Sequence, residues 1–257
     1  MSWNPTLYRR FEDERTRPAQ DLLSRVGLEK ATQVVDLGCG PGNSTELLVE
    51  RFAGARVLGT DTSEAMLESA RLRLPNCEFE LGDVSSWQPH TQPDLIFANA
   101  VLQWVPAHEQ LFPRLFAALA KGGVLAVQMP DNLQEPSHRS MREVASKGPW
   151  SSVLADATRA RAPIPPPEAY YDWLAADAAS IDIWRTTYQH PMASPADIVD
   201  WVRATGLRPF IDPLSDALRA GFLLEYEQRI AEAYPTRADG KRLLAFPRLF
   251  IVARRKD

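Results

Sequence analysis

The chain has 257 residues, of which 45% are hydrophobic and 24% are charged, and its formal net charge is −4 at pH 7. This balance is ordinary for a folded enzyme-sized domain, and it excludes the strongly basic surface by which proteins hold nucleic acid or anionic membranes. We therefore expect neither a nucleic acid nor a membrane as a partner.

The first residues, MSWNPTLYRRFEDERTRP, are polar and charged and do not have the pattern of a secretory leader. No apolar stretch reaches the ~18 residues needed to cross a membrane. The two cysteines, Cys39 and Cys77, are too few for a disulfide framework, and the histidines lack metal-ligand spacing. These features predict a cytoplasmic protein without a bound metal, and we expect it to act as a monomer.

Short apolar runs alternate with amphipathic stretches between about residues 20 and 130. The expected strands lie at residues 34–37, 56–60, 78–81, 95–98 and 124–129. Asn43, with Glu46 completing a capping box, is expected to cap the helix after the first strand, and Ser63 the helix after the second. The alternation predicts an α/β fold, in which a parallel sheet has helices on both faces. Because such connections are right-handed, the loop after the first strand is expected at the carboxyl edge, near the point where the strand order reverses.

The alternation breaks after Met129. Residues 130–180 are rich in proline and partly helical in pattern, so they are expected to form a helical insertion or cap within a single domain of residues 1–257. The elements expected beyond it are a strand at residues 181–190, helices at 195–205 and 215–234, and a strand at 248–256. The two late strands are expected to pair antiparallel at one edge of the sheet.

A glycine-rich loop, within VVDLGCGPGNST at residues 34–45, follows the first strand. Its glycines, Gly38, Gly40 and Gly42, have the spacing G-x-G-x-G, whereas dinucleotide sites that hold a pyrophosphate have G-x-G-x-x-G. Asn43 takes the place of the third fingerprint glycine, and no Lys-Ser/Thr pair follows as in a P-loop. The loop therefore predicts a nucleotide-like ligand but weakens an NAD or nucleoside-phosphate interpretation.

Three carboxylates lie at the ends of neighbouring strands. Asp36 lies just before the loop, where a carboxylate repels a pyrophosphate and attracts a cation. Asp61, after the second strand, is placed to accept two ribose hydroxyls, and Asp83, after the third, could accept an adenine amino group. A ribose, an amino group, a positive charge and no phosphate are the features of S-adenosylmethionine, which we predict as the cofactor.

Four segments, VVDLGCGPG, GTDTSEAM, LGDVSSW and DLIFANAVLQWV, are similar in order and spacing to the cofactor motifs of class I S-adenosylmethionine-dependent methyltransferases. The resemblance implies a Rossmann-like, doubly wound sheet of seven mostly parallel strands with an antiparallel C-terminal edge strand. It also implies S-adenosylhomocysteine as a product. The residues implied to bind the cofactor are Asp36, Gly38, Gly40, Asn43, Asp61, Thr62, Met66, Asp83, Val84 and Asn99.

A narrower resemblance covers nearly the whole chain. The segments WNPTLYRRFEDERTRPAQDLL, VQMPDN, AYYDWL, DIWRTTYQH, DWVRATGLRPF and LLAFPRLFIVARR are similar to those of methyltransferases that esterify trans-aconitate. This resemblance implies a carboxyl O-methyltransferase that acts on a small-molecule tricarboxylate, with residues 130–180 as a cap over the acceptor site. Residues 150–163 do not follow this pattern.

A carboxylate acceptor is already ionised at pH 7, since its reference pKa is near ~4, so no general base is expected. It needs cationic groups that hold its other carboxylates, and arginine is favoured because its fork binds them bidentately. The candidate acceptor residues are Arg15, Arg17, Gln103, Trp104, Gln128, Tyr170, Tyr171, Arg185, Tyr188 and Arg248. Arg185 and Tyr188 lie three apart in a strand, so they should point to opposite faces. For Trp104, Tyr170 and Tyr171, packing is an equally good interpretation.

Two other functions stay open. The acceptor could be a hydroxyl or carbon nucleophile of another small metabolite, which needs a base, and His190 or Tyr188 would be the first candidates. Converging arginines in the pocket favour the carboxylate, whereas an apolar pocket with a buried histidine favours this alternative. The chain could also bind and sense the cofactor without catalysis. The segment ANAVLQW lacks the Asn/Asp-Pro-Pro-aromatic pattern of relatives that methylate amines, so transfer to an amine is disfavoured.

Overall fold

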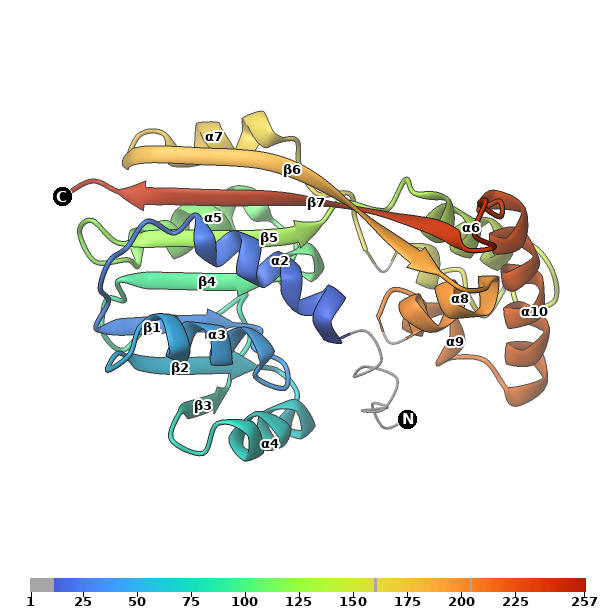
Figure 1. The fold of residues 1–257 in the computed structure, drawn as a ribbon, viewed down its shortest axis with the longest axis horizontal. Coiled ribbons are helices and arrows are strands. Elements are labelled where there is room, and N and C mark those ends of the chain that lie inside the picture. The colour runs from blue at the N-terminus through green and yellow to red at the C-terminus, as the bar shows by residue number, and fades with distance from the viewer. Residues whose placement is uncertain (1–11, 160, 204) are drawn as a thin grey trace. The chain divides into compact units, whose positions relative to one another are not determined.

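The computed structural model describes residues 12–159, 161–203 and 205–257, and residues 3–11 of the N-terminal segment quoted above lie outside them. Within these ranges, one sheet contains seven strands in the order β3-β2-β1-β4-β5-β7-β6 (Figure 1). The strands are β1 Gln33–Leu37, β2 Arg56–Asp61, β3 Glu78–Leu81, β4 Leu95–Asn99, β5 Val124–Pro130, β6 Ala178–Met192 and β7 Arg242–Arg255. Strands β1 to β5 pair in parallel, whereas β7 runs antiparallel to β5. The predicted α/β fold class is confirmed, but the C-terminal strand β7 lies between β5 and β6, so β6 and not β7 forms that edge of the sheet.

Helices account for most of the remaining described structure. They are α2 Glu12–Ser24, α3 Asn43–Arg51, α4 Glu64–Arg73, α5 His108–Ala117, α6 Pro136–Ala145, α7 Pro167–Leu174, α8 Pro195–Arg203, α9 Arg208–Ile211 and α10 Asp216–Ala233, with 3-10 helices η1 Leu102–Trp104 and η2 Ala157–Arg159. None of the helices in the described ranges is long and apolar enough to cross a membrane.

The described residues divide into two compact units. The sheet unit comprises residues 15–130, 164–186 and 248–257, and the helical unit comprises residues 131–163 and 187–247 with residues 12–14. The expected cap is therefore divided, with α6 in the helical unit and α7 in the sheet unit. Its role over the acceptor, and the single domain of residues 1–257, stay predictions.

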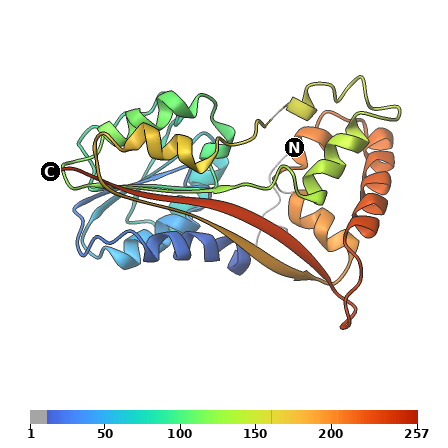
Figure 2. The same ribbon diagram turned by 90° about the horizontal axis from the view of Figure 1, so that it is seen from above.

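Helices cover both faces of the sheet unit. Figure 2 shows the blue helices α2 and α3 on one face and the green α5 and yellow α7 on the other. On the α5–α7 side, Leu37, Ile96 and Val127 pack against Phe112 in a fully buried core. Because side chains alternate along a strand, Asp36, which precedes Leu37, faces the α2–α3 side. The same alternation places the polar strand residues of the site on the α2–α3 face.

The helical unit has a separate core. Trp150 packs edge-on against Phe222 of α10, with ring centroids 5.4 Å apart, and its Nε1 donates a hydrogen bond to the carbonyl oxygen of Val144, 2.7 Å away. Leu154 is also fully buried in this core. Residues 150–163, which the sequence pattern did not assign, therefore begin with packing residues.

The structure corrects two local expectations and refines a third. Asn43 is the first residue of α3, and Gly42 is its N-cap, with φ at 92°, a left-handed conformation that glycine adopts more readily than asparagine. Ser63 caps α4 as expected, although its side chain makes no capping hydrogen bond. β7 begins at Arg242, before the expected start, because the strand continues through Pro247, which interrupts the sequence pattern.

Candidate active site

Polar side chains from four strands share the α2–α3 face near the carboxyl edge of the parallel strands. Asp36 of β1 is level with Phe97 of β4. Two residues further along β4, Asn99 pairs with Gln128 of β5. On β7, Arg248 pairs with Pro130, which lies two residues beyond Gln128 on the same face of the sheet. Paired positions on neighbouring strands lie on the same face, so Asp36, Asn99, Gln128 and Arg248 form one polar row.

Asp36 is fully buried at the β1 end of this row. Its Oδ2 accepts hydrogen bonds from the hydroxyls of Ser44 and Thr45 at the start of α3, each 2.7 Å long. Its Oδ1 has no hydrogen-bond partner within the described part of the chain. Burial raises the pKa of Asp36 to about 7, the two hydroxyls oppose this rise, and the negative charge of Asp61 adds to it. A cation near Oδ1 would favour the ionised form, so the position suits a positively charged ligand.

The glycine loop is fixed from two sides. At Gly38, with φ at 67°, an added Cβ would lie 2.3 Å from Cγ2 of Val101, so only glycine fits beneath the loop after β4. The Asp61 carboxylate accepts a hydrogen bond from the Gly40 backbone N–H (3.0 Å) with Oδ2 and another from the Ser63 backbone N–H (2.9 Å) with Oδ1. An added Cβ at Gly40 would meet nothing within 4 Å, so the loop presents open space there.

The predicted cofactor residues share the carboxyl edge of the parallel strands. All ten belong to the sheet unit and lie at or after the carboxyl ends of β1, β2, β3 and β4. Thr62 is exposed, Asn43 and Met66 are half-buried, and Val84 is buried. Asp83 is exposed and accepts a hydrogen bond from the backbone N–H two residues on (2.8 Å), which lowers the pKa of its carboxyl. Their contact with a cofactor stays a prediction.

The β5–β7 end of the row holds a buried arginine that is hydrogen-bonded to a buried glutamine. Arg248 is 4% exposed, and its Nη1 donates a 3.0 Å hydrogen bond to Oε1 of the fully buried Gln128. Gln103 in η1 donates from Nε2 to the carbonyl oxygen of Ala100, 2.6 Å away. Among the described residues, Nε2 of Gln128, Oε1 of Gln103 and Oδ1 of Asn99 are buried without hydrogen-bond partners. Buried polar atoms normally have partners, so three such atoms around one edge indicate a site for a polar ligand.

Several predicted acceptor residues lie nearer the surface. Arg17 is exposed and pairs with an aspartate one helical turn away, at a distance of 3.9 Å. Trp104 is 44% exposed, Tyr171 is 54% exposed, and Arg185 is also exposed. Arg15, near the start of α2, is half-buried. Their substrate contacts stay predictions.

Two predicted tyrosines are packed within cores. Tyr170 is fully buried on α7, with its ring centroid 4.6 Å from that of Phe112, which favours its packing interpretation. Tyr188 is buried, whereas Arg185 is exposed, as expected for residues on opposite faces. In the helical unit, the rings of Tyr188 and His190 stack with centroids 6.2 Å apart. The two base candidates of the alternative function are therefore both packed aromatic residues.

Some residues of the site were missed in the sequence. Ser44 and Thr45 hold Asp36, and their hydroxyls directly after the glycine loop were the only local signal. Val101 abuts Gly38, and His108 reaches back to the loop that follows β4. The contact between Val101 and Gly38 joins the loops after β4 and β1, which are distant in sequence, so no spacing pattern reports it.

Both cysteines are free thiols, and Cys39 is buried in the glycine loop. Burial raises the pKa of the Cys39 thiol far above its usual range, and the negative charges of Asp36 and Asp61 add to the rise. A thiol that stays protonated is a poor nucleophile, so a nucleophilic role for Cys39 is disfavoured. In the described part of the chain, no group of three or more His, Cys, Asp or Glu residues could hold a metal ion.

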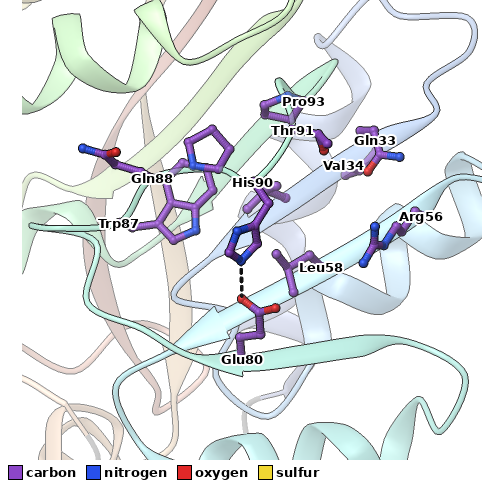
Figure 3. A pocket seen from close by; sticks show the side chains of 12 residues that line it. Gln33, Val34, Arg56, Leu58, Glu80, Trp87, Gln88, His90, Thr91 and Pro93 are labelled. Atoms are coloured by element: carbon purple, nitrogen blue, oxygen red, sulfur yellow. Dashed lines mark ion pairs between the residues drawn. The ribbon is translucent and has the colours of Figure 1, made fainter.

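A pocket in the sheet unit lies away from these residues. Gln33 and Arg56, which begin β1 and β2, line it together with Trp87 from the loop after β3 (Figure 3). His90 faces Glu80 across it, with Nε2 and Oε2 3.8 Å apart. None of the predicted site residues lines this pocket, which includes the amino ends of β1 and β2, so it is not the candidate active site.

The comparison with protein families matches residues 34–123 to a methyltransferase domain. A trans-aconitate 2-methyltransferase of Variovorax paradoxus is 64% identical over 257 residues, which cover 100% of this chain and 99% of the relative. A trans-aconitate 2-methyltransferase of Paracidovorax citrulli is 66% identical over 255 residues, covering 98% of each chain. These likenesses extend over both compact units.

Solved structures share the fold at low sequence identity. The YcgJ protein of Bacillus subtilis aligns with a TM-score of 0.59 at 13% identity, over 94% of this chain and 99% of its own. Phosphoethanolamine N-methyltransferase 2 of Haemonchus contortus, in complex with S-adenosyl-L-methionine, aligns with a TM-score of 0.56 at 16% identity, over 94% of this chain and 53% of its own. At these identities the two comparisons show a shared fold and nothing more.

Proposed function

The chain belongs to the trans-aconitate 2-methyltransferase family, and we propose that it transfers a methyl group from S-adenosylmethionine to a carboxylate of trans-aconitate. The products are the monomethyl ester and S-adenosylhomocysteine. The observation that carries this proposal is the buried Arg248–Gln128 pair on the same sheet face as the buried acid Asp36. One end of the polar row suits a cation and the other suits an anion.

The residues of the glycine loop fit S-adenosylmethionine. Asp36 places a buried carboxylate oxygen without a described partner beside a loop that opens at Gly40. Asp61, at the end of β2, would accept the ribose hydroxyls, and Asp83 would accept the adenine amino group. When bound, S-adenosylmethionine supplies an activated methyl group on a positively charged sulfur. Asp36 would stabilise that positive charge at short range, where burial strengthens the electrostatic interaction.

The acceptor end needs positioning more than proton transfer. A carboxylate is ionised at neutral pH, because its reference pKa is near ~4, so the chain needs no base to make it nucleophilic. Arg248 would hold a carboxylate that is not methylated, and Nε2 of Gln128 would donate a further hydrogen bond to it. A guanidinium fixed by Gln128 restricts the orientation of the acid, and such alignment is the main source of acceleration available here.

The second candidate function is transfer to a hydroxyl or carbon nucleophile. It needs a base, and the buried His190 in the helical unit is the observation that favours it. Stacking of His190 on Tyr188 gives it a packing role instead. A cofactor sensor without catalysis does not account for the Arg248–Gln128 pair.

A transfer assay separates these functions. Purified protein with S-adenosylmethionine labelled in the methyl group is offered a panel of di- and tricarboxylic acids and, in parallel, hydroxylated metabolites without carboxylates. The proposal expects transfer to trans-aconitate above all other compounds. Transfer only to the hydroxylated metabolites favours the second function, and tight cofactor binding without transfer to any compound favours a sensor. Sedimentation of the same preparation tests the expected monomer.

A further inference from the structure

A buried hydrogen-bond chain connects α7 and α5 to the loop that follows β4. Tyr170 of α7 lies with its hydroxyl 2.7 Å from Nδ1 of His108, the first residue of α5. On the other side of the ring, Nε2 of His108 is 2.9 Å from the carbonyl oxygen of Leu102 in η1. Tyr170 is 0% exposed and His108 is 5% exposed, so water does not compete for these bonds.

The chemistry of the partners fixes the direction of each hydrogen bond. The carbonyl oxygen of Leu102 can only accept, so Nε2 of His108 carries the proton and donates. Burial lowers the pKa of His108, although hydrogen bonds to the backbone at Leu102 and Val105 oppose this, so the ring is neutral at pH 7. A neutral ring protonated at Nε2 accepts at Nδ1, and Tyr170 therefore donates to it. One tautomer is selected.

The loop that this chain holds is strained. Ala100 and Ala107 both have φ at 56°, a left-handed conformation that alanine rarely adopts. Such residues persist where the surrounding structure holds them in place, and they gather at functional sites. Val101, which follows Ala100, abuts Gly38, and His108, which follows Ala107, binds Leu102.

The same loop carries part of the candidate acceptor site. Gln103 follows Leu102 directly, and its amide folds back onto the carbonyl oxygen of Ala100. The backbone N–H of Ala100 donates to the carbonyl oxygen of Gln128, 2.9 Å away, which joins the loop to the β5 end of the polar row. His108 thus binds the residue next to Gln103, in the same loop that Ala100 joins to β5.

We propose that His108 and Tyr170 are positioning residues for the acceptor, an inference that rests on the proposed function. Tyr170 holds the His108 ring in one orientation, and His108 holds residues 100–104 so that Gln103 can donate to the acid with the second hydrogen of Nε2, the first being donated to Ala100. This role differs from the direct substrate contact that the sequence suggested for Tyr170. The ring of Tyr170, 5.2 Å from that of Trp173 between centroids, is held by packing and would stay in place without its hydroxyl.

The test compares two substitutions that each remove one buried hydroxyl. Tyr170→Phe breaks the chain to His108, whereas Tyr226→Phe breaks an equally buried bond to the carbonyl oxygen of Ser137 in the helical unit. We expect both to lower Tm, but only Tyr170→Phe to lower kcat/KM for the acid about tenfold, with the Kd of S-adenosylhomocysteine changed less than threefold. An equal loss of kcat/KM in both variants, or no loss in Tyr170→Phe, overturns the proposal.

A conservative substitution at the ring supplies a second kinetic readout. Gln at position 108 can still donate a hydrogen bond toward Leu102, so we expect His108→Gln to keep more of the acid kcat/KM than His108→Leu. Equal kinetics in the two variants, with both folded, would contradict a role through that hydrogen bond.

Nuclear magnetic resonance of protein labelled with nitrogen-15 histidine tests the inference without any acceptor. Its four histidines give few signals. The signal that Tyr170→Phe perturbs should belong to a neutral ring protonated at Nε2. A proton at Nδ1, or a charged ring at pH 7, refutes the positioning role even if the protein methylates trans-aconitate. Conversely, if the expected tautomer is observed but no acid is methylated, the proposed function is refuted while the hydrogen-bond chain is confirmed.

Discussion

Replacing Asp36 by Asn should make the free energy of unfolding depend less on pH. Burial raises the pKa of Asp36 from its usual 3.8 to about 7, so the folded protein binds this proton more tightly than the unfolded chain does. The free energy of unfolding therefore falls as the pH rises between these two values. One pKa unit corresponds to about 1.4 kcal/mol, so the full loss approaches about 4 kcal/mol, of which about 2 kcal/mol lies between pH 5 and pH 7.

Asp36→Asn retains an oxygen that can accept from Ser44 or Thr45 but carries no charge at any of these pH values. Urea unfolding without cofactor, followed by circular dichroism, gives the difference in unfolding free energy between variant and wild type at each pH. That difference should shift by about 2 kcal/mol in favour of the variant between pH 5 and pH 7. Comparing the two pH values cancels any effect of the substitution that does not depend on pH.

Asp94→Asn is the matched control. Partial burial raises the pKa of Asp94, but hydrogen bonds from Thr32 and Gln33 outweigh this and lower it. A lowered pKa contributes stability that is lost only as the pH falls below the usual value, so this variant should differ from wild type by a constant amount between pH 5 and pH 7. A constant difference for Asp36→Asn as well would refute the view that Asp36 is a buried acid lacking a counter-charge.

Three further predictions concern the two ends of the site. Arg248→Gln should raise KM for the acid at least tenfold while leaving cofactor affinity nearly unchanged, since a hydrogen bond to a charged group contributes about 1.5–3 kcal/mol. If the affinities for the acid and for the cofactor both fall, Arg248 has a structural role. Gly38→Ala should lower Tm more than Gly54→Ala, because both have positive φ but only the first new Cβ would strike Val101; equal shifts contradict the close contact. Asp61→Ala should weaken cofactor binding by about 1–3 kcal/mol in calorimetry, and unchanged affinity excludes it from the cofactor site.

The parallel sheet was predictable because its strands are short buried runs separated by helix and turn signals. The strands found at β1 to β5 match the expected ranges to within one residue at either end. The glycine loop and Asp61 were also predictable, since their spacing reflects a backbone geometry that few sequences satisfy. Such a site can be predicted because its residues lie within about thirty residues of one another in the sequence.

The rest of the site depends on contacts between distant elements. Tyr170 was expected to reach the substrate or to pack, and only the arrangement of α5 and α7 brings it to His108, 62 residues away in sequence. The same holds for Arg248, whose pairing with Gln128 spans 120 residues. Asn43 was misassigned because asparagine is a good N-cap in general, whereas this loop requires a positive φ that favours Gly42.

The central claim is that the acceptor is a carboxylate, and the chemical identity of the methylated product tests it most directly. The protein is incubated with trans-aconitate and S-adenosylmethionine carrying a carbon-13 methyl group, and the product is examined by nuclear magnetic resonance before and after mild alkali. The account predicts one labelled methyl ester that alkali converts to labelled methanol. A label that survives alkali on oxygen or carbon, or no labelled product while the cofactor binds tightly, would contradict it.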